Sequence, residues 1–213
     1  MPKSPTPSKL YLVLPALPDA QTLLDLAKAC LNLGCLGALL LKSENKATQS
    51  TKTLRKTVIS LQALGIATLI ENDVGLARSV GADGVHLDYA PNYLKQYATA
   101  RKELGTKLIV GAEIKSSRHE AMCLGEKGAD YIAFGKDLKI NNKQVAHLEQ
   151  QELVAWWAEL FEVPSVALDI ETPLEAKTMS EAGADFIAIK LPQEITLKTV
   201  EKFLAPFVAA LRS

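Results

Sequence analysis

The sequence predicts a closed barrel of eight parallel strands, each followed by a helix, in the α/β class. Eight short apolar runs alternate with eight helix-length segments along 213 residues. Most of these runs are continuously apolar, as in strands that are covered on both faces. The turn Gly-Ala-Asp also occurs three times, at 81–83, 128–130 and 183–185, each time between a helical stretch and an apolar run. Three copies of one helix-to-strand connection indicate a repeated architecture, and equal units without a long linker favour a closed (β/α)8 barrel over an open sheet.

The expected elements follow one another in strict alternation. Apolar residues recur at i, i+3 and i+4 spacing between the strands, which is typical of helices that cover a sheet. Glycines end most of these helical segments, where a left-handed residue is favourable: Gly34, Gly65, Gly81, Gly105, Gly128 and Gly183. The expected strands are Leu10–Leu14, Gly37–Leu41, Ile66–Ile70, Gly84–Leu87, Lys107–Val110, Tyr131–Phe134, Ser165–Leu168 and Phe186–Ile189. Residues 10–213 would form the one barrel domain, and the Pro- and Ser-rich residues 1–9 a flexible N-terminal tail.

Composition excludes several classes of function. Lys plus Arg and Asp plus Glu each number 24, so the net charge is zero. Nucleic-acid and membrane surfaces usually need clustered basic charge, so neither partner is expected. No apolar run approaches the roughly 20 residues that span a bilayer, and no secretory leader is recognised. Cys30, Cys35 and Cys123 lack metal-ligand spacing and are expected to be thiols. We therefore expect a cytoplasmic protein that acts on a small molecule, with a homo-oligomer left open.

Polar residues gather where the expected strands end, which is the end at which a parallel barrel holds its chemistry. Asn72 and Asp73 follow the third strand, and His86 and Asp88 lie at the end of the fourth. Asn and Asp are also good helix N-caps, so one interpretation is that Asn72 and Asp73 cap the next helix. The other is that they face a ligand, and the two roles are compatible. Burial with a structural hydrogen bond is the default for His86.

Taken in order, these motifs resemble the thiamine phosphate synthase family and its thiazole tautomerase relatives. The specific part is Asn-Asp followed by Gly-Ala-Asp-Gly-Val-His-Leu, because a lone Gly-Ala-Asp occurs in many barrels. The matching segments run through most of the chain: Leu10–Val13, Leu69–Asp73, Gly81–Leu87, Ile109–Gly111, Gly128–Gly135 and Ala182–Asp185.

The resemblance implies a transferase of thiamine biosynthesis. Such a synthase joins an aminopyrimidine diphosphate to a thiazole phosphate and releases pyrophosphate. The resemblance further implies that Asn72 faces the diphosphate, that Asp73 holds Mg²⁺, and that Asp88 is the second metal ligand, although it is displaced from the family's position. A carboxylate on a hard cation lets the metal neutralise a leaving diphosphate.

Several phosphate contacts of the family are replaced in this chain. The family's Gln-Leu-Arg-Glu/Asp-Lys stretch reads Leu39–Ser43 here, with Lys42 as its one cation, and Val74 stands in place of an Arg. The family's Pro-Thr-Pro-Thr-Lys loop after the sixth strand is reduced to Lys136–Lys143, where Lys139 or Lys143 would stand in for its lysine.

The loops after the fifth, seventh and eighth strands also differ from the pattern of the family. Glu113 replaces a Ser that touches phosphate, and Asp169 replaces a Gly in the loop whose backbone approaches phosphate. Both substitutions place negative charge where an anion would bind. Lys190 follows the eighth strand, and we expect it to pair with Asp169 rather than to bind a phosphate.

Lys115 occupies the place of a catalytic His in the tautomerases. A desolvated Lys can act as a base, but beside Glu113 an ion pair is the stronger expectation.

Three functions follow from these observations. The first is a divergent synthase that uses Asp73, Asp88, Mg²⁺ and replacement lysines on a phosphorylated small molecule. The second is a catalytically inactive or repurposed paralogue that binds a small ligand. The third is a metal-independent isomerase or tautomerase-type barrel that transfers protons with Lys115, Glu113 or Asp169. The first is the main hypothesis.

Overall fold

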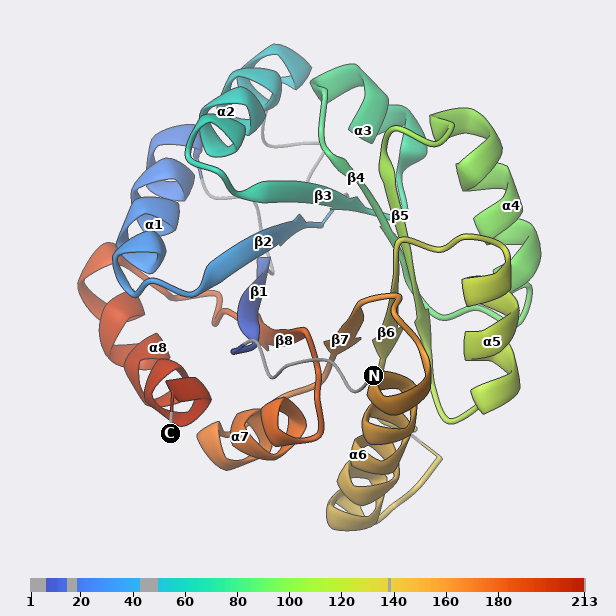
Figure 1. Ribbon diagram of the computed structural model, residues 1–213. Helices are drawn as coiled ribbons and strands as arrows, with labels where there is room; N and C mark the ends of the chain where they lie inside the picture. Colours follow the sequence, from blue (N-terminus) through green and yellow to red (C-terminus); the bar gives the residue numbers. More distant parts are fainter. Residues whose placement is uncertain (1–6, 15–18, 43–49, 138, 213) are drawn as a thin grey trace.

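In the computed structural model, parallel strands close into a barrel that a ring of helices surrounds (Figure 1). The structure describes residues 7–14, 19–42, 50–137 and 139–212. Within these ranges there are eight strands and eight helices in strict alternation. Strand order around the barrel follows chain order, and β8 closes it by pairing with β1. The prediction of a (β/α)8 barrel is confirmed.

The elements have the following bounds. The strands are β1 (Lys9–Leu14), β2 (Leu36–Leu41), β3 (Ala67–Glu71), β4 (Gly84–Leu87), β5 (Ile109–Ile114), β6 (Tyr131–Phe134), β7 (Ser165–Ala167) and β8 (Phe186–Lys190). The helices are α1 (Ala20–Asn32), α2 (Thr51–Ala63), α3 (Val74–Val80), α4 (Tyr93–Leu104), α5 (Arg118–Glu126), α6 (Lys143–Leu160), α7 (Pro173–Glu181) and α8 (Leu197–Arg212).

Two strand boundaries differ from expectation in ways that matter. β5 begins at Ile109 and runs to Ile114, whereas the sequence places its end at Val110. Because Glu113 is polar, the sequence places it in the loop after the strand, but in the structure it belongs to β5. At the other end of the chain β1 begins at Lys9, and the buried Ser8 hydroxyl donates to the Ala184 carbonyl at 2.6 Å. Residues 1–6 of the expected tail lie outside the described residues.

The Gly-Ala-Asp connections share one hydrogen-bond pattern. Each Asp lies just before an even-numbered strand, and its carboxylate accepts a backbone N–H from the preceding odd-numbered strand. The bonds are Asp83 to Thr68 N–H (2.7 Å), Asp130 to Val110 N–H (2.7 Å) and Asp185 to Ser165 N–H (2.8 Å). The expected helix-exit glycines all have positive φ, as predicted. The repeat is therefore an architectural clamp at the amino-terminal end of the strands.

Helices cover the barrel with apolar side chains. Trp157 is fully buried and stacks on Phe161 with ring centroids 4.1 Å apart. The neighbouring Trp156 is partly buried against the core, and the Arg118 guanidinium lies over its ring. Both tryptophans thus contribute to helix packing. None of the described helices combines the length and apolar character needed to cross a membrane.

The hydrogen bonds of the Gly-Ala-Asp clamps predict that removing one Asp carboxylate lowers the stability of the protein. Asp83→Ala removes the acceptor of the buried Thr68 N–H, and we expect the free energy of unfolding to fall by about 1–3 kcal/mol. Urea denaturation followed by circular dichroism measures this change. Glu103→Ala, at an exposed position of α4, is the matched control and should change stability by less than about 0.5 kcal/mol. Equal stability of the two variants would contradict the clamp.

Candidate functional site

The carboxyl ends of the strands surround a cavity of about 590 Å³, here called the mouth. Seven of the ten predicted site residues line it, whereas Asn72, Asp73 and Lys139 do not. The polar and charged residues of its lining are Lys42, Glu71, His86, Asp88, Tyr89, Glu113, Lys115, Asp169, Glu171 and Lys190. The polar strand ends that the sequence singles out thus meet in one place.

His86 is held at the floor of the mouth by two tyrosines inside the barrel. It is 2% exposed, and its Nδ1 lies 2.7 Å from the Tyr131 hydroxyl, which in turn lies 3.1 Å from the Tyr11 hydroxyl. Burial lowers the pKa of His86 to about 4, so the ring is neutral at pH 7. Its Nε2 faces Asp88, whose Oδ1 is 3.8 Å away. Burial with a structural hydrogen bond, the default expectation, is confirmed.

Tyr131 occupies its place because a neighbouring strand provides no side chain there. A Cβ at Gly111 of β5 would lie 1.9 Å from the Tyr131 ring, so only glycine leaves room for it. Tyr11 and Tyr131 also line an apolar cavity of about 280 Å³ on the other side of this layer, at the strand starts. Neither tyrosine was predicted from the sequence as part of the site, since each reads as an ordinary strand residue.

Glu113 and Lys115 form the ion pair that the sequence predicts. The Lys115 ammonium bonds Glu113 Oε1 and lies 4.0 Å from Asp169 Oδ2, while Glu113 Oε2 accepts the Tyr89 N–H at 3.1 Å. Burial raises the pKa of Glu113, and the nearby Lys115 charge opposes that shift. Gly135 lies against the group, because a Cβ there would be 2.5 Å from Glu113 Oε1. A base role for a neutral Lys115 gains no support from this pairing.

The pair expected between Asp169 and Lys190 does not form. Asp169 has a φ of 56°, and its Oδ2 accepts the Lys136 N–H at 3.0 Å, which draws the carboxylate toward the β6 loop. Lys190 is exposed at the end of β8 and makes no ion pair within the described part of the chain. The left-handed backbone at Asp169 therefore explains the difference, and Lys190 keeps its ammonium at the mouth.

Lys42 has a partner that was not predicted from the sequence. Its Nζ lies 3.0 Å from Oε1 of Glu71, which is the last residue of β3 and only 6% exposed. One feature of the sequence could have indicated a site role for Glu71: it is an acidic residue at the end of an apolar strand, directly before the Asn-Asp pair. Lys42 is therefore committed to a buried carboxylate.

Asn72 and Asp73 have separate roles. Asp73 Oδ1 accepts the Leu76 N–H at 2.8 Å and caps α3, so the capping interpretation is confirmed for this residue. Asn72, with a φ of 53°, instead holds Asp88 by two bonds of 2.9 Å. Its Nδ2 donates to Asp88 Oδ2, and its Oδ1 accepts the Asp88 N–H. Asn72 therefore fixes the orientation of a mouth carboxylate.

The lysines of the loop after β6 do not line the mouth. Lys139 is exposed, and Lys143 pairs with Glu171 at 3.0 Å on the rim. Lys136 is 8% exposed and bonds Glu175 of the α7 capping box at 2.8 Å. Neither Lys139 nor Lys143 takes the place of the family's loop lysine within the mouth.

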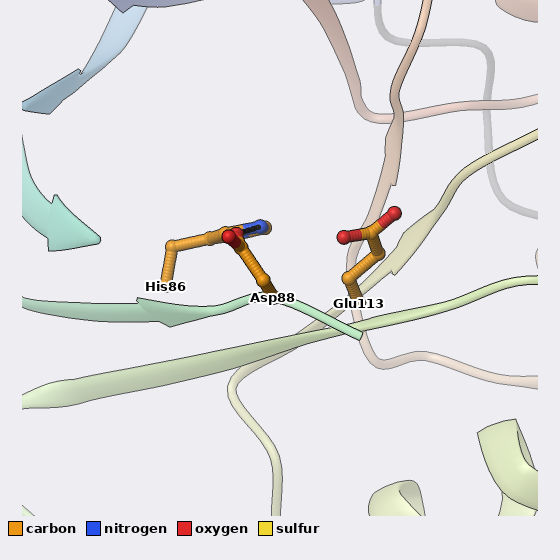
Figure 2. Close-up of side chains that lie close together, drawn as sticks. All are labelled: His86, Asp88 and Glu113. Carbon is orange, nitrogen blue, oxygen red and sulfur yellow. Dashed lines mark ion pairs between the residues drawn. The ribbon is translucent and has the colours of Figure 1, made fainter. Parts of the chain in front are cut away.

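Three donors at the mouth are grouped closely enough to hold a cation. His86, Asp88 and Glu113 each offer one ligand atom, and these atoms lie within 4.8 Å of one another. Figure 2 shows the Glu113 carboxylate directed toward the His86 ring. Three lysines and five carboxylates line the mouth. This excess of negative charge favours a cation, or an anion that carries one with it.

Comparison with known proteins decides the family. The model of the family described as thiamine monophosphate synthase matches residues 10–190. The chain belongs to this family. Thiamine-phosphate synthases of Rhodospirillum centenum and Hyphomonas neptunium are each 34% identical to it over 188 residues, covering 86% and 85% of this chain and 88% and 84% of theirs. The structure of thiamine phosphate pyrophosphorylase from Pyrococcus furiosus has a TM-score of 0.69 at 20% identity, covers 96% of this chain and 97% of its own, and shows the same fold.

Within this barrel of the thiamine monophosphate synthase family, three charged residues cluster on one side of the mouth. Glu113, Lys115 and Asp169 contact one another across β5 and the loop after β7. These three side chains are thus packed into one charged group. His86 and the Asn72–Asp88 unit lie beside it.

The burial of His86 predicts a pH dependence. In metal-free protein its ring should stay neutral until the pH falls to about 4. The unfolded chain takes up this proton near pH 6.5, so stability is full above that pH and falls by about 3 kcal/mol as the pH falls toward 4. Proton NMR of the imidazole and urea denaturation across this range measure both effects. His86→Gln should remove this part of the pH dependence, and a ring that titrates near 6.5 would contradict it.

Proposed function

We propose that the protein is a thiamine-phosphate synthase, a transferase of thiamine biosynthesis. The reaction would join an aminopyrimidine diphosphate to a thiazole phosphate. The bond from the pyrimidine-bearing carbon to the diphosphate oxygen breaks, its electron pair leaves with pyrophosphate, and the thiazole takes the vacated position. The observation that carries the proposal is the family match from residue 10 to 190 on a barrel whose mouth gathers the polar strand ends.

The donor set of the mouth fits a divalent cation. Mg²⁺ is usually held by one or two carboxylates together with substrate phosphates. Asp88 and Glu113 offer such carboxylates within 4.8 Å of each other. The family resemblance adds Asp73, which caps α3 through its Oδ1 and lies next to Asn72, outside the lining of the mouth. When bound, Mg²⁺ would neutralise charge on the departing diphosphate. We therefore propose Mg²⁺ as the cofactor, with Asp88 as its main ligand.

The protein's own groups would position the phosphorylated substrates. Lys190 is an exposed ammonium at the mouth and supplies a contact for phosphate. Asn72 holds Asp88 in one orientation, and the neutral His86 ring offers a nitrogen to the substrate or its cation. Lys42 and Lys115 already neutralise Glu71 and Glu113, so they would lower the negative potential of the site rather than bind phosphate directly. The cellular setting we propose is the cytoplasm.

A second candidate is a barrel that binds a small ligand without synthase chemistry. The observation that favours it is the closed group of Glu113, Lys115 and Asp169, which would occupy space that the resemblance leaves to a phosphate. Such a protein would bind a cationic or zwitterionic molecule better than a diphosphate, because carboxylates outnumber lysines in the mouth.

Pyrophosphate release separates the two candidates. Purified protein should release pyrophosphate from the two substrates with Mg²⁺, and Asp88→Asn should lower kcat/KM by about 100-fold or more. Asp73→Asn and Asp73→Ala test the capping aspartate. Asn keeps the cap, so Asp73→Asn should remain as stable as wild type yet lose activity, whereas Asp73→Ala should lose both. Absence of release from folded wild-type protein would overturn the synthase proposal.

A further inference from the structure

We propose that His86, Asp88 and Glu113 form a binding site for a divalent first-row transition metal ion. The site differs from the pair of aspartates that the family resemblance implies. It shares Asp88 and Glu113 with the Mg²⁺ site of the proposed function and adds His86 as a nitrogen ligand. Metal binding can be measured without either substrate, so the two proposals fail separately.

The donor set points to this class of ion. One neutral imidazole nitrogen with two carboxylate oxygens suits zinc, manganese, cobalt or iron, whereas Mg²⁺ prefers oxygen alone. Ligand atoms at about 2.0–2.2 Å from such an ion lie roughly 3–4 Å from one another. The three donors are within 4.8 Å, so a small closing movement completes the site. The Asp88 side chain is 45% exposed and can provide that movement.

His86 has an arrangement typical of a metal ligand. Nδ1 is 2.7 Å from the Tyr131 hydroxyl, while Nε2, on a ring that is only 2% exposed, has no hydrogen bond within the described residues and faces Asp88 Oδ1 at 3.8 Å. Ligating histidines almost always donate their other ring N–H to a neighbouring group, which fixes the ring and its tautomer. Metal at Nε2 would place the hydrogen on Nδ1, with Tyr131 accepting it. Nε2 thus faces Asp88 and is directed toward the carboxylate group of the site without a hydrogen bond among the described residues.

Lys115 acts as the competing cation. Its ammonium holds Glu113 Oε1, the oxygen that is not already bonded to the Tyr89 N–H, and it lies 4.0 Å from Asp169 Oδ2. A metal ion that takes Oε1 displaces the ammonium, and Asp169 is close enough to receive it. With Asp88, Glu113 and Asp169 ionised and Lys115 retained, the group carries a charge of about −2, and a bound divalent ion neutralises it.

The test uses tag-free, chelator-treated protein and titrations with Co²⁺ and Mn²⁺ by calorimetry. Wild type should bind one ion, and pulsed electron paramagnetic resonance of bound Mn²⁺ should show coupling to one imidazole nitrogen. Glu113→Gln, Asp88→Asn and His86→Gln should each weaken binding by about 100-fold or more. Tyr131→Phe keeps all three ligands and should weaken binding about tenfold.

Two further variants distinguish this site from a general attraction of cations to the acidic mouth. Lys115→Met removes the competing charge and should tighten Co²⁺ binding about tenfold. Glu171→Gln is the matched control, because it removes another negative charge of the mouth but lies outside the three-ligand group, so Co²⁺ affinity should change little. Binding without nitrogen coupling, binding that Glu171→Gln weakens as much as Asp88→Asn does, or no binding to folded wild type would each overturn the proposal. These outcomes are distinct from failure to release pyrophosphate, which concerns the synthase proposal alone.

Discussion

The constraint on which the rest of the structure depends is closure of eight parallel strands in a register that brings their carboxyl ends together. Aspartates of the Gly-Ala-Asp connections contribute to it by accepting a backbone N–H from a neighbouring strand at three points around the barrel. Each bond sets one strand against the next at its amino-terminal end. The polar residues at the opposite ends then meet in a single cavity.

Negative charge in that cavity has to be compensated. Glu71 and Glu113 are both buried, and each has a lysine within ion-pair distance, Lys42 and Lys115 respectively. Removing either lysine would leave a buried carboxylate without its counter-charge, which is costly in a low-dielectric interior. The lysines at these positions therefore act first as internal counter-ions. This explains how the barrel tolerates buried acidic residues at its mouth.

Sequence reasoning predicted the barrel and most of the mouth for physical reasons. Apolar runs and helix-exit glycines are local signals, and strand ends converge in any closed parallel barrel, so seven predicted residues met as expected. Side-chain pairing is not local. The Asp169–Lys190 pair failed because a left-handed residue bonded to the Lys136 N–H cannot be read from residue types. The site roles of Glu71 and Tyr131 were not predicted, because the side chains that surround a strand residue depend on how the barrel closes.

The paired hydrogen bonds between Asn72 and Asp88 limit how the carboxylate can be used. Because the Asn72 Oδ1 accepts the Asp88 N–H, the amide orientation is fixed and its Nδ2 must occupy Asp88 Oδ2. Oδ1, the oxygen facing His86, accepts no bond from Asn72 and is the one placed for a cation. The arrangement thereby favours monodentate coordination by Asp88. A metal ion at the mouth would retain open coordination positions for oxygen atoms of a substrate, so the amide of Asn72 controls how many exchangeable sites the ion presents.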